Sequence, residues 1–191
     1  MKTNRIEAFS DGMLAIIITI MVLELKAPHG ADLPALAPLL PPFLSYVLSF
    51  VYLGIYWNNH HHMLHTTPTV TGGILWANLH LMFWLSLFPA ATAWMGDNHF
   101  AATPTALYGF VLLMAAIAYS LLQWTIIASQ SGNSLLRRAI GRDIKGKASI
   151  VLYAAAIPLA FIAAPLSALI YVSVALMWLV PDRRIERALL G

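Results

Sequence analysis

The feature that most constrains the fold is a long apolar run near the C-terminal end of the chain. From Ala148 to Val180, 33 consecutive residues carry no charge. A single helix of that length would measure about 50 Å, whereas the hydrocarbon core of a bilayer is only about 30 Å thick. Pro158 and Pro165 lie inside the run, and proline interrupts the interior of a helix. We therefore expect two membrane spans, at about 146–162 and 166–181, joined by a tight turn.

Four further apolar segments precede this hairpin. Hydrophobic residues make up 60% of the 191 residues and charged residues only 10%, which excludes an ordinary soluble domain. The absence of cysteine excludes disulfides and thiolate metal sites. The sequence thus predicts an all-α, polytopic membrane protein, with residues 1–191 forming one domain of six transmembrane helices. The first four spans are expected at about 5–26, 43–65, 73–95 and 104–128.

The positive charges set the orientation of these spans. With six spans, ten of the eleven lysines and arginines lie on one side of the membrane, and only Lys26 lies opposite. Cytoplasmic loops are enriched in these residues, so both termini are expected in the cytoplasm of a cell-membrane protein. The net charge of +3 then reflects orientation and contact with anionic membrane lipid, and we expect no nucleic-acid partner.

The first span is unusual because its unbroken apolar part, Gly12 to Leu23, is only about 18 Å long. A full span must reach back to Arg5, which draws Ser10 and Asp11 inside the membrane edge. A carboxylate there costs about 2.5–3.5 kcal/mol, so it should face protein and be paired.

A helical wheel divides this span into two faces. Glu7 and Asp11 lie on one face. The opposite face forms a stripe, which would meet either lipid or a neighbouring helix. It consists of Arg5, Phe9, Gly12, Ile16, Thr19, Ile20 and Leu23.

Histidines cluster at the end of the second span, and three interpretations are open. In a structural network, a histidine together with Asn78 or His80 would satisfy Asp11. The second interpretation is a proton sensor or relay. Finally, His61 and His65 have an i, i+4 spacing that suits a metal, but no acid or cysteine in the second span completes such a site, so we expect none.

Motifs of catalysis and nucleotide binding are missing from the sequence. It contains no Walker loop, no G-x-S-x-G and no H-E-x-x-H. We therefore expect no enzyme activity, no catalytic residues and no cofactor.

The first span carries a family resemblance. Arg5-x-x-x-Phe9-Ser10-Asp11, followed by Ile16 to Met21, closely resembles the signature of the transmembrane protein 175 family, whose members are potassium-permeable channels. Trp57 to His61 and Leu75 to Asn78 are similar to its second- and third-helix patterns. The single six-helix unit is typical of the prokaryotic form. The resemblance implies a homotetramer that conducts potassium ions through a pore lined by the first helix, without a selectivity-filter loop.

The same resemblance implies roles for particular residues. Ile16 would form a narrow ring that closes the pore by dewetting, and Thr19 would form a hydroxyl layer one turn outward. Leu23, with Ile20, would form a further apolar ring. A structural network would tie the first helix to the next two, and would comprise Arg5, Phe9, Ser10, Asp11, His60, His61 and Asn78.

A proton-coupled secondary transporter is the competing prediction. It would use Asp11 and the His60–His65 cluster as its proton site. It would show saturable, pH-coupled flux and would work as a monomer, whereas a channel of this kind needs a pore shared between subunits.

Overall fold

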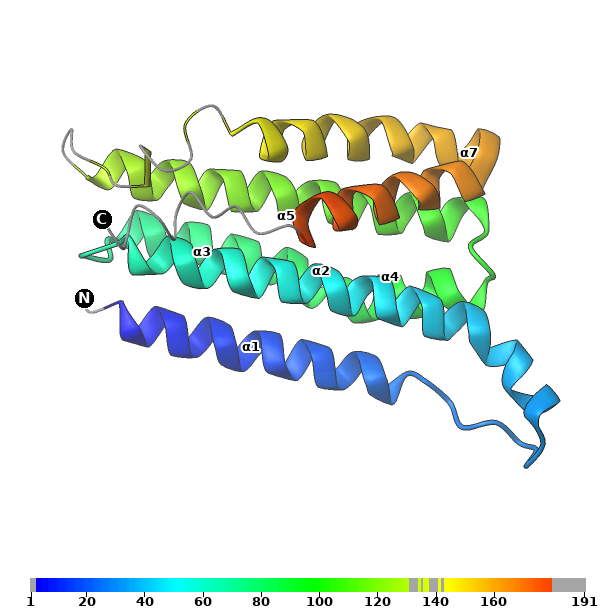
Figure 1. Cartoon of the computed structure of the whole chain (residues 1–191). Coiled ribbons are helices and arrows are strands. Elements are labelled where there is room, and N and C mark those ends of the chain that lie inside the picture. Colours follow the sequence, from blue (N-terminus) through cyan, green and yellow to red (C-terminus); the bar gives the residue numbers. More distant parts are fainter. Residues whose placement is uncertain (1–2, 131–133, 135, 138–140, 142, 180–191) are drawn as a thin grey trace.

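Apolar helices make up most of the described part of the chain. The computed structural model describes residues 3–130, 134, 136–137, 141 and 143–179. Its elements are α1 (Asn4–Leu23), the 3₁₀ helix η1 (Leu33–Leu39), α2 (Leu40–His65), α3 (Gly72–Ser86), α4 (Phe88–Asp97), α5 (Ala102–Ser129) and α7 (Ile144–Leu179). These residues contain five helical segments long and apolar enough to cross a membrane. The helices lie roughly parallel in one bundle, as expected for a multi-pass membrane protein (Figure 1).

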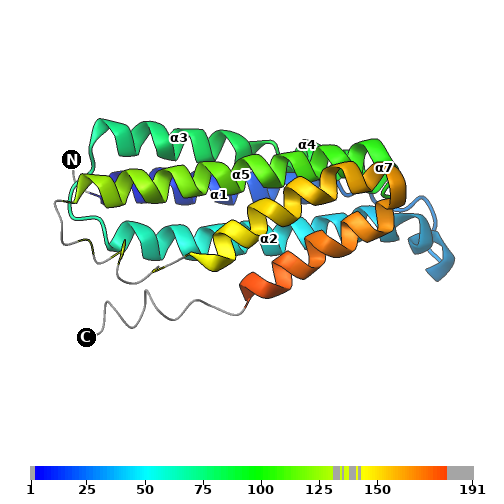
Figure 2. The ribbon, with the colours of Figure 1, turned by 90° about the horizontal axis from the view of Figure 1, so that it is seen from above.

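The last apolar run folds back on itself. Ala163 leaves the helical region, with φ −151° and ψ 81°, and divides α7 into two arms. The arms lie side by side, because Ser167 Oγ donates to the Ala156 carbonyl at 2.9 Å and Trp178 Nε1 donates to Ser149 Oγ at 2.9 Å. Figure 2 shows the two arms meeting at the bend. The break falls between the two expected spans; residues 180 and 181 of the second lie outside the described residues.

The expected third span, 73–95, is not one continuous helix. The chain separates at Leu87 into α3 and α4. Pro89 lies in the first turn of α4 and has no N–H to donate to the preceding helix, so the hydrogen-bond ladder stops there. Residues 72–97 together remain long enough to cross a membrane.

Other helix bounds differ by a few residues from the predictions. α1 ends at Leu23 rather than at residue 26, and α2 begins at Leu40 rather than at residue 43. The segment before α2, which contains Pro34 and Pro38, forms η1.

Three segments that are distant in sequence meet at one end of the bundle. Thr3 Oγ1 donates to the Thr67 carbonyl at 2.8 Å, and Gln130 Nε2 donates to the Thr66 carbonyl at 2.8 Å. The start of α1, the turn after α2 and the end of α5 therefore share this end, where Figure 1 also shows the N-terminus. The predicted cytoplasmic tail, including residues 183, 184 and 187, lies outside the described residues.

A buried tyrosine cluster joins the central helices. Tyr52 on α2 donates to the Tyr171 carbonyl at 2.6 Å and accepts from the Tyr153 hydroxyl at 3.1 Å. The Tyr171 hydroxyl donates to the Thr105 carbonyl of α5 at 3.2 Å. Because each hydroxyl finds a partner inside the bundle, these side chains stabilise α2, α5 and α7 as one unit.

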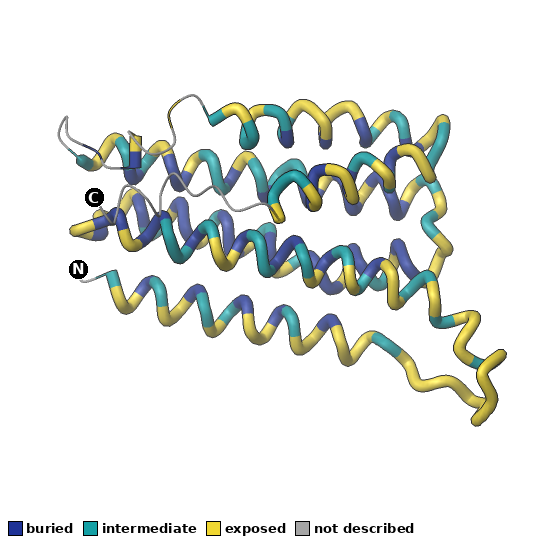
Figure 3. Tube along the Cα trace, viewed as in Figure 1, coloured by how far each residue is buried: buried dark blue, intermediate teal, exposed yellow. Residues whose placement is uncertain are grey.

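α1 lies at the edge of this unit. It packs against α2, α3 and α4, and Figure 3 shows its buried positions turned toward the bundle and its exposed positions turned away. The buried residues of α1 are Ile6, Ser10, Leu14, Ile17 and Met21. Their spacing of three or four residues gives a single buried stripe.

Candidate functional site on the first helix

Three fully buried polar side chains connect α1 to its neighbours. Ser10 of α1, Asn78 of α3 and His60 of α2 are each at most 1% exposed. Asn78 Nδ2 donates to Ser10 Oγ at 3.0 Å, and Ser10 Oγ in turn donates to the Ile6 carbonyl at 2.8 Å. His60 Nε2 lies 2.7 Å from Asn78 Oδ1. We refer to Ser10, Asn78 and His60 as the buried triad.

The chemistry of the triad fixes the direction of its hydrogen bonds. An amide oxygen only accepts, so His60 Nε2 carries a proton and donates it to Asn78 Oδ1. His60 Nδ1 is buried and has no partner among the described residues, which suits its role as the unprotonated nitrogen of a neutral ring. In a membrane interior such directional bonds hold helices in one rotational setting.

Asp11 is not part of the triad, which corrects one expectation. Its Oδ1 accepts a hydrogen bond from Trp57 Nε1 of α2 at 3.0 Å, in an exposed setting. Neither Asn78 nor His80 contacts it through a hydrogen bond; His80 Nε2 instead accepts from Trp84 Nε1 at 2.9 Å. The buried polar position was Ser10, one residue earlier. Asp11 lies near the surface, where it needs fewer partners.

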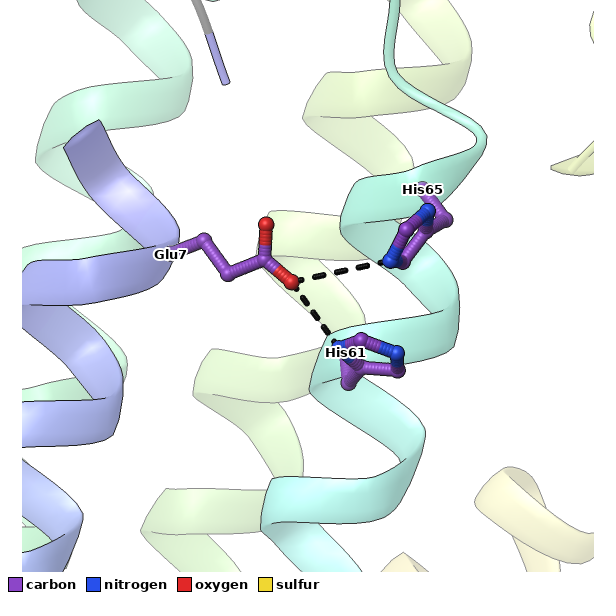
Figure 4. Close-up of side chains that lie close together, drawn as sticks. All are labelled: Glu7, His61 and His65. Carbon is purple, nitrogen blue, oxygen red and sulfur yellow. Dashed lines mark hydrogen bonds and ion pairs between the residues drawn. The ribbon is translucent and has the colours of Figure 1, made fainter. Parts of the chain in front are cut away.

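Glu7 is the acid that meets the histidines. Its Oε1 lies 2.9 Å from His61 Nδ1 and 3.7 Å from His65 Nε2. Both histidines come from the last turns of α2, and Figure 4 shows them converging on the carboxylate of α1. The prediction of no metal site considered only ligands on the second span. The structure brings the acid from a different helix.

Arg5 and Phe9 lie outside these contacts. Both are exposed, Phe9 by 47%, and the Arg5 side chain forms no hydrogen bond or ion pair among the described residues. Within a single protomer they therefore do not join α1 to α2 and α3. Of the seven residues expected in the structural network, the structure brings Ser10, His60 and Asn78 directly together.

The stripe expected on α1 lies on its exposed side. All seven of its residues are exposed within the protomer, including Ile16 at 59% and Leu23 at 75%. The Thr19 hydroxyl donates to the Ala15 carbonyl of its own helix at 2.8 Å. Its oxygen lone pairs therefore remain available on the exposed side. From Phe9 to Leu23, this side of α1 presents an apolar surface with one hydroxyl.

Sequence reasoning missed the partners of both acids. Glu7 and Asp11 were expected on one face, and the structure pairs them with His61 and Trp57 of α2. The spacing of four residues in each helix is the signal that could have found them, because Glu7 and Asp11 on α1 face His61 and Trp57 in antiparallel register.

Comparisons with known proteins bear directly on this helix. A family model described as the endosomal/lysosomal potassium channel TMEM175 matches residues 5–89, from the start of α1 to the start of α4. A potassium channel of Chryseobacterium sp. (strain P1-3) is 54% identical over 189 residues, which cover 99% of this chain and 98% of that protein. The chain belongs to the TMEM175 family.

More distant members of the TMEM175 family resemble the chain as well. A potassium channel of Streptomyces collinus is 31% identical over 183 residues, covering 87% of this chain and 86% of that protein. The crystal structure of a lysosomal potassium-selective channel TMEM175 homolog from Chamaesiphon minutus superposes with a TM-score of 0.82 at 26% identity, over 94% of this chain and 97% of that one. The names of these relatives describe channels, not enzymes.

Replacing Asn78 tests the buried triad of this TMEM175 member. Asn78→Ala should lower stability by about 1–2 kcal/mol, because the His60 N–H and the Ser10 hydroxyl oxygen lose their buried partner. Thermal denaturation in detergent, followed by size-exclusion chromatography, measures this loss. Asn98→Ala is the matched control, since Asn98 is exposed and bonds only within its own helix end. Equal stability of the two variants would contradict a structural role for the triad.

Proposed function

We propose that four copies of this chain form a potassium-permeable channel whose pore is lined by α1. One observation carries the proposal: α1 is held to its own protomer by buried polar groups, while its opposite side exposes a continuous stripe that includes Ile16, Thr19 and Leu23. The channel names of the relatives support it. So does the match of the family model, which begins at the first helix.

The packed interior of the protomer favours a path between copies. Large apolar side chains such as Leu53, Phe88 and Leu112 fill the centre of the bundle and are fully buried. Such close packing leaves little space for a hydrated ion. A water-filled path along the outer surface of α1, enclosed by other copies of the same surface, avoids this obstacle.

Side chains, rather than backbone carbonyls, would contact the ion in this pore. From Asn4 to Leu23 the chain is a regular helix, in which each carbonyl before the last turn accepts an intrahelical bond. A carbonyl selectivity filter requires backbone oxygens free to replace the ion's hydration shell. The lining of α1 therefore provides only side-chain hydroxyls, and we expect modest selectivity for potassium over sodium.

The stripe assigns different roles to its residues. Four Ile16 side chains around one axis would form an apolar constriction that closes by dewetting. Thr19, one turn further along, would offer hydroxyl oxygens to a partly dehydrated potassium ion. Ile20 and Leu23 would form a second apolar ring near the end of the helix. Potassium is the permeant ion, and no cofactor is required.

The orientation follows from charge. Thr3, the turn at Thr66 and the end of α5 share one end of the bundle. Arg137 follows α5 in the sequence, and Lys145 lies in the first turn of α7. The enrichment of cytoplasmic loops in lysine and arginine supports both termini in the cytoplasm and a location in the cell membrane.

Polar substitution at the proposed constriction should open it. Ile16→Asn lets water wet the narrow ring and should raise potassium flux in reconstituted liposomes by about tenfold or more, since each 1.4 kcal/mol removed from a barrier is tenfold in rate. Val22→Asn is the control, because Val22 is also exposed on α1 but lies outside the stripe. Unchanged flux in Ile16→Asn would mean that the constriction lies at another residue. Saturable, pH-coupled flux from monomers would favour the transporter that uses Asp11 and the histidines.

Cross-linking tests whether the stripe meets its own copies. The chain has no cysteine, so Leu23→Cys provides the sole thiol. Around a shared axis, neighbouring thiols come close enough for disulfide formation, which requires Cα atoms within about 7 Å. Non-reducing electrophoresis of oxidised membranes should then show covalent dimers. Ile162→Cys, on a side chain 84% exposed at the bend of α7, should remain monomeric. If Leu23→Cys stayed monomeric and Ile162→Cys formed dimers, α1 would face lipid and not its own copies.

Removing one hydroxyl tests the role of Thr19. Thr19→Val keeps the shape of the side chain and removes the oxygen lone pairs, so the preference for potassium over sodium should fall. Reversal potentials in planar bilayers measure the change. Thr125→Val is the matched control, because the Thr125 hydroxyl likewise donates to its own helix, at the Leu121 carbonyl of α5. An unaltered preference in Thr19→Val would assign selectivity to another layer.

A further inference from the structure

Three potential metal ligands converge from two helices at the end of the bundle that holds the N-terminal end of α1. Glu7 projects from the first turns of α1, and His61 and His65 project from successive turns of α2 (Figure 4). One carboxylate oxygen and one ring nitrogen from each histidine all lie within 4.8 Å of one another. The two imidazole rings are close as well, with centroids 4.3 Å apart.

A simple hydrogen bond accounts for only part of this arrangement. His61 Nδ1 lies 2.9 Å from Glu7 Oε1, at hydrogen-bond distance. His65 Nε2 lies 3.7 Å from the same oxygen, which is too long for a hydrogen bond. Two rings nevertheless converge on one carboxylate, and a small cation between the three groups would contact all of them.

The distances suit a tetrahedral transition-metal ion. Zinc binds nitrogen and oxygen ligands at about 2.0–2.2 Å, so neighbouring ligand atoms in a tetrahedral site lie about 3.3 Å apart. The separations of 2.9 and 3.7 Å from the carboxylate lie on either side of that value. The ring nitrogens of His61 and His65 lie within 4.8 Å of each other. If their separation is near this limit, it must shorten for both nitrogens to bind one ion. Both side chains lie on the surface of α2, where they can adjust.

Exposure allows an ion to enter and the ligands to adjust. The side chains of His61 and His65 are 40% and 52% exposed, and that of Glu7 is 22% exposed. Three protein ligands leave a fourth position for water. Trp57 packs beside the site. Its ring stacks on His61 with centroids 6.1 Å apart, and its Nε1 donates to Asp11.

We propose that Glu7, His61 and His65 form a binding site for a divalent transition-metal ion of the zinc class. Two imidazoles and one carboxylate favour such borderline ions over calcium or magnesium, which prefer oxygen ligands. The ion replaces the proton between Glu7 and His61 and connects α1 to α2 at one point. In combination with the proposed function, the ion ties the pore-lining helix to its own protomer and changes potassium flux.

Direct binding tests the site without reference to transport. The probes are ZnCl₂ in isothermal titration calorimetry and CoCl₂ in absorption spectroscopy, on tag-free protein stripped of metal. We expect one zinc per chain and a cobalt d–d spectrum typical of tetrahedral nitrogen and oxygen ligands. Glu7→Gln and His65→Ala should weaken zinc binding by roughly tenfold or more, because even second-shell partners cost 10–100-fold. His29→Ala, which replaces an exposed histidine outside the cluster, should bind as the parent does.

The outcomes separate the metal site from the channel. Absent or non-stoichiometric zinc binding, or binding unchanged in both Glu7→Gln and His65→Ala, overturns the site. If Glu7→Gln does not fold, His65→Ala carries the comparison because its side chain is half exposed. Liposome flux with and without zinc then tests the consequence. Zinc binding without any potassium flux rejects the proposed function and leaves the site standing. Flux that responds to zinc equally in parent and variants rejects regulation through this site.

Discussion

The orientation of α1 depends on the buried triad. Most of the remaining buried contacts of this helix are apolar, from Leu14, Ile17 and Met21, and apolar contacts have no preferred direction. The hydrogen bonds that Asn78 donates to Ser10, and that His60 donates to Asn78, do have one. They fix which side of α1 faces its protomer, and therefore which side remains exposed. Without them, a peripheral helix could turn by one residue and bury part of the stripe.

The protomer thus combines a tyrosine-linked unit with a peripheral helix, α1. The tyrosine cluster links α2, α5 and α7 through three hydroxyl hydrogen bonds and one contact between aromatic rings, around Tyr52 and Tyr171. α1 contributes no residue to this cluster; it packs on α2, which is a member of the cluster, and on α3 and α4. Movement of α1 would leave the tyrosine cluster intact. This separation suits a protein in which one helix changes position while the rest keeps its fold.

The sequence predicted the apolar helices well, because the length and hydrophobicity of a segment can be read from its own residues. It placed the bend of α7 between the spans 146–162 and 166–181, where Ala163 breaks the helix. It missed the separation of α3 from α4, because the apolar segment around Pro89 is long enough for one membrane span and its hydrophobicity does not reveal the break. It also predicted the stripe on α1, but it expected a histidine and Asn78 to satisfy Asp11, whereas the structure places Ser10 in that position. A wheel shows that Ser10 and Asp11 point about 100° apart, but it does not show which of the two directions faces the neighbouring helices.

The distribution of polar contacts along α1 favours tilt over rotation as its motion. Rotation about the helix axis would break the bonds of Ser10, whereas a tilt about Ser10 would keep them. At 1.5 Å per residue, Ile16 lies about 9 Å and Leu23 about 20 Å from that pivot. A given tilt therefore moves Leu23 about twice as far as Ile16. Near the far end, the only side-chain hydrogen bond between α1 and another helix of the described residues is the one that the Thr92 hydroxyl donates to Met21 Sδ at 3.9 Å. It is a weak bond to an adaptable side chain. In the proposed channel, such a tilt would widen the stripe most at its Leu23 end and would keep the hydrogen bonds of the triad.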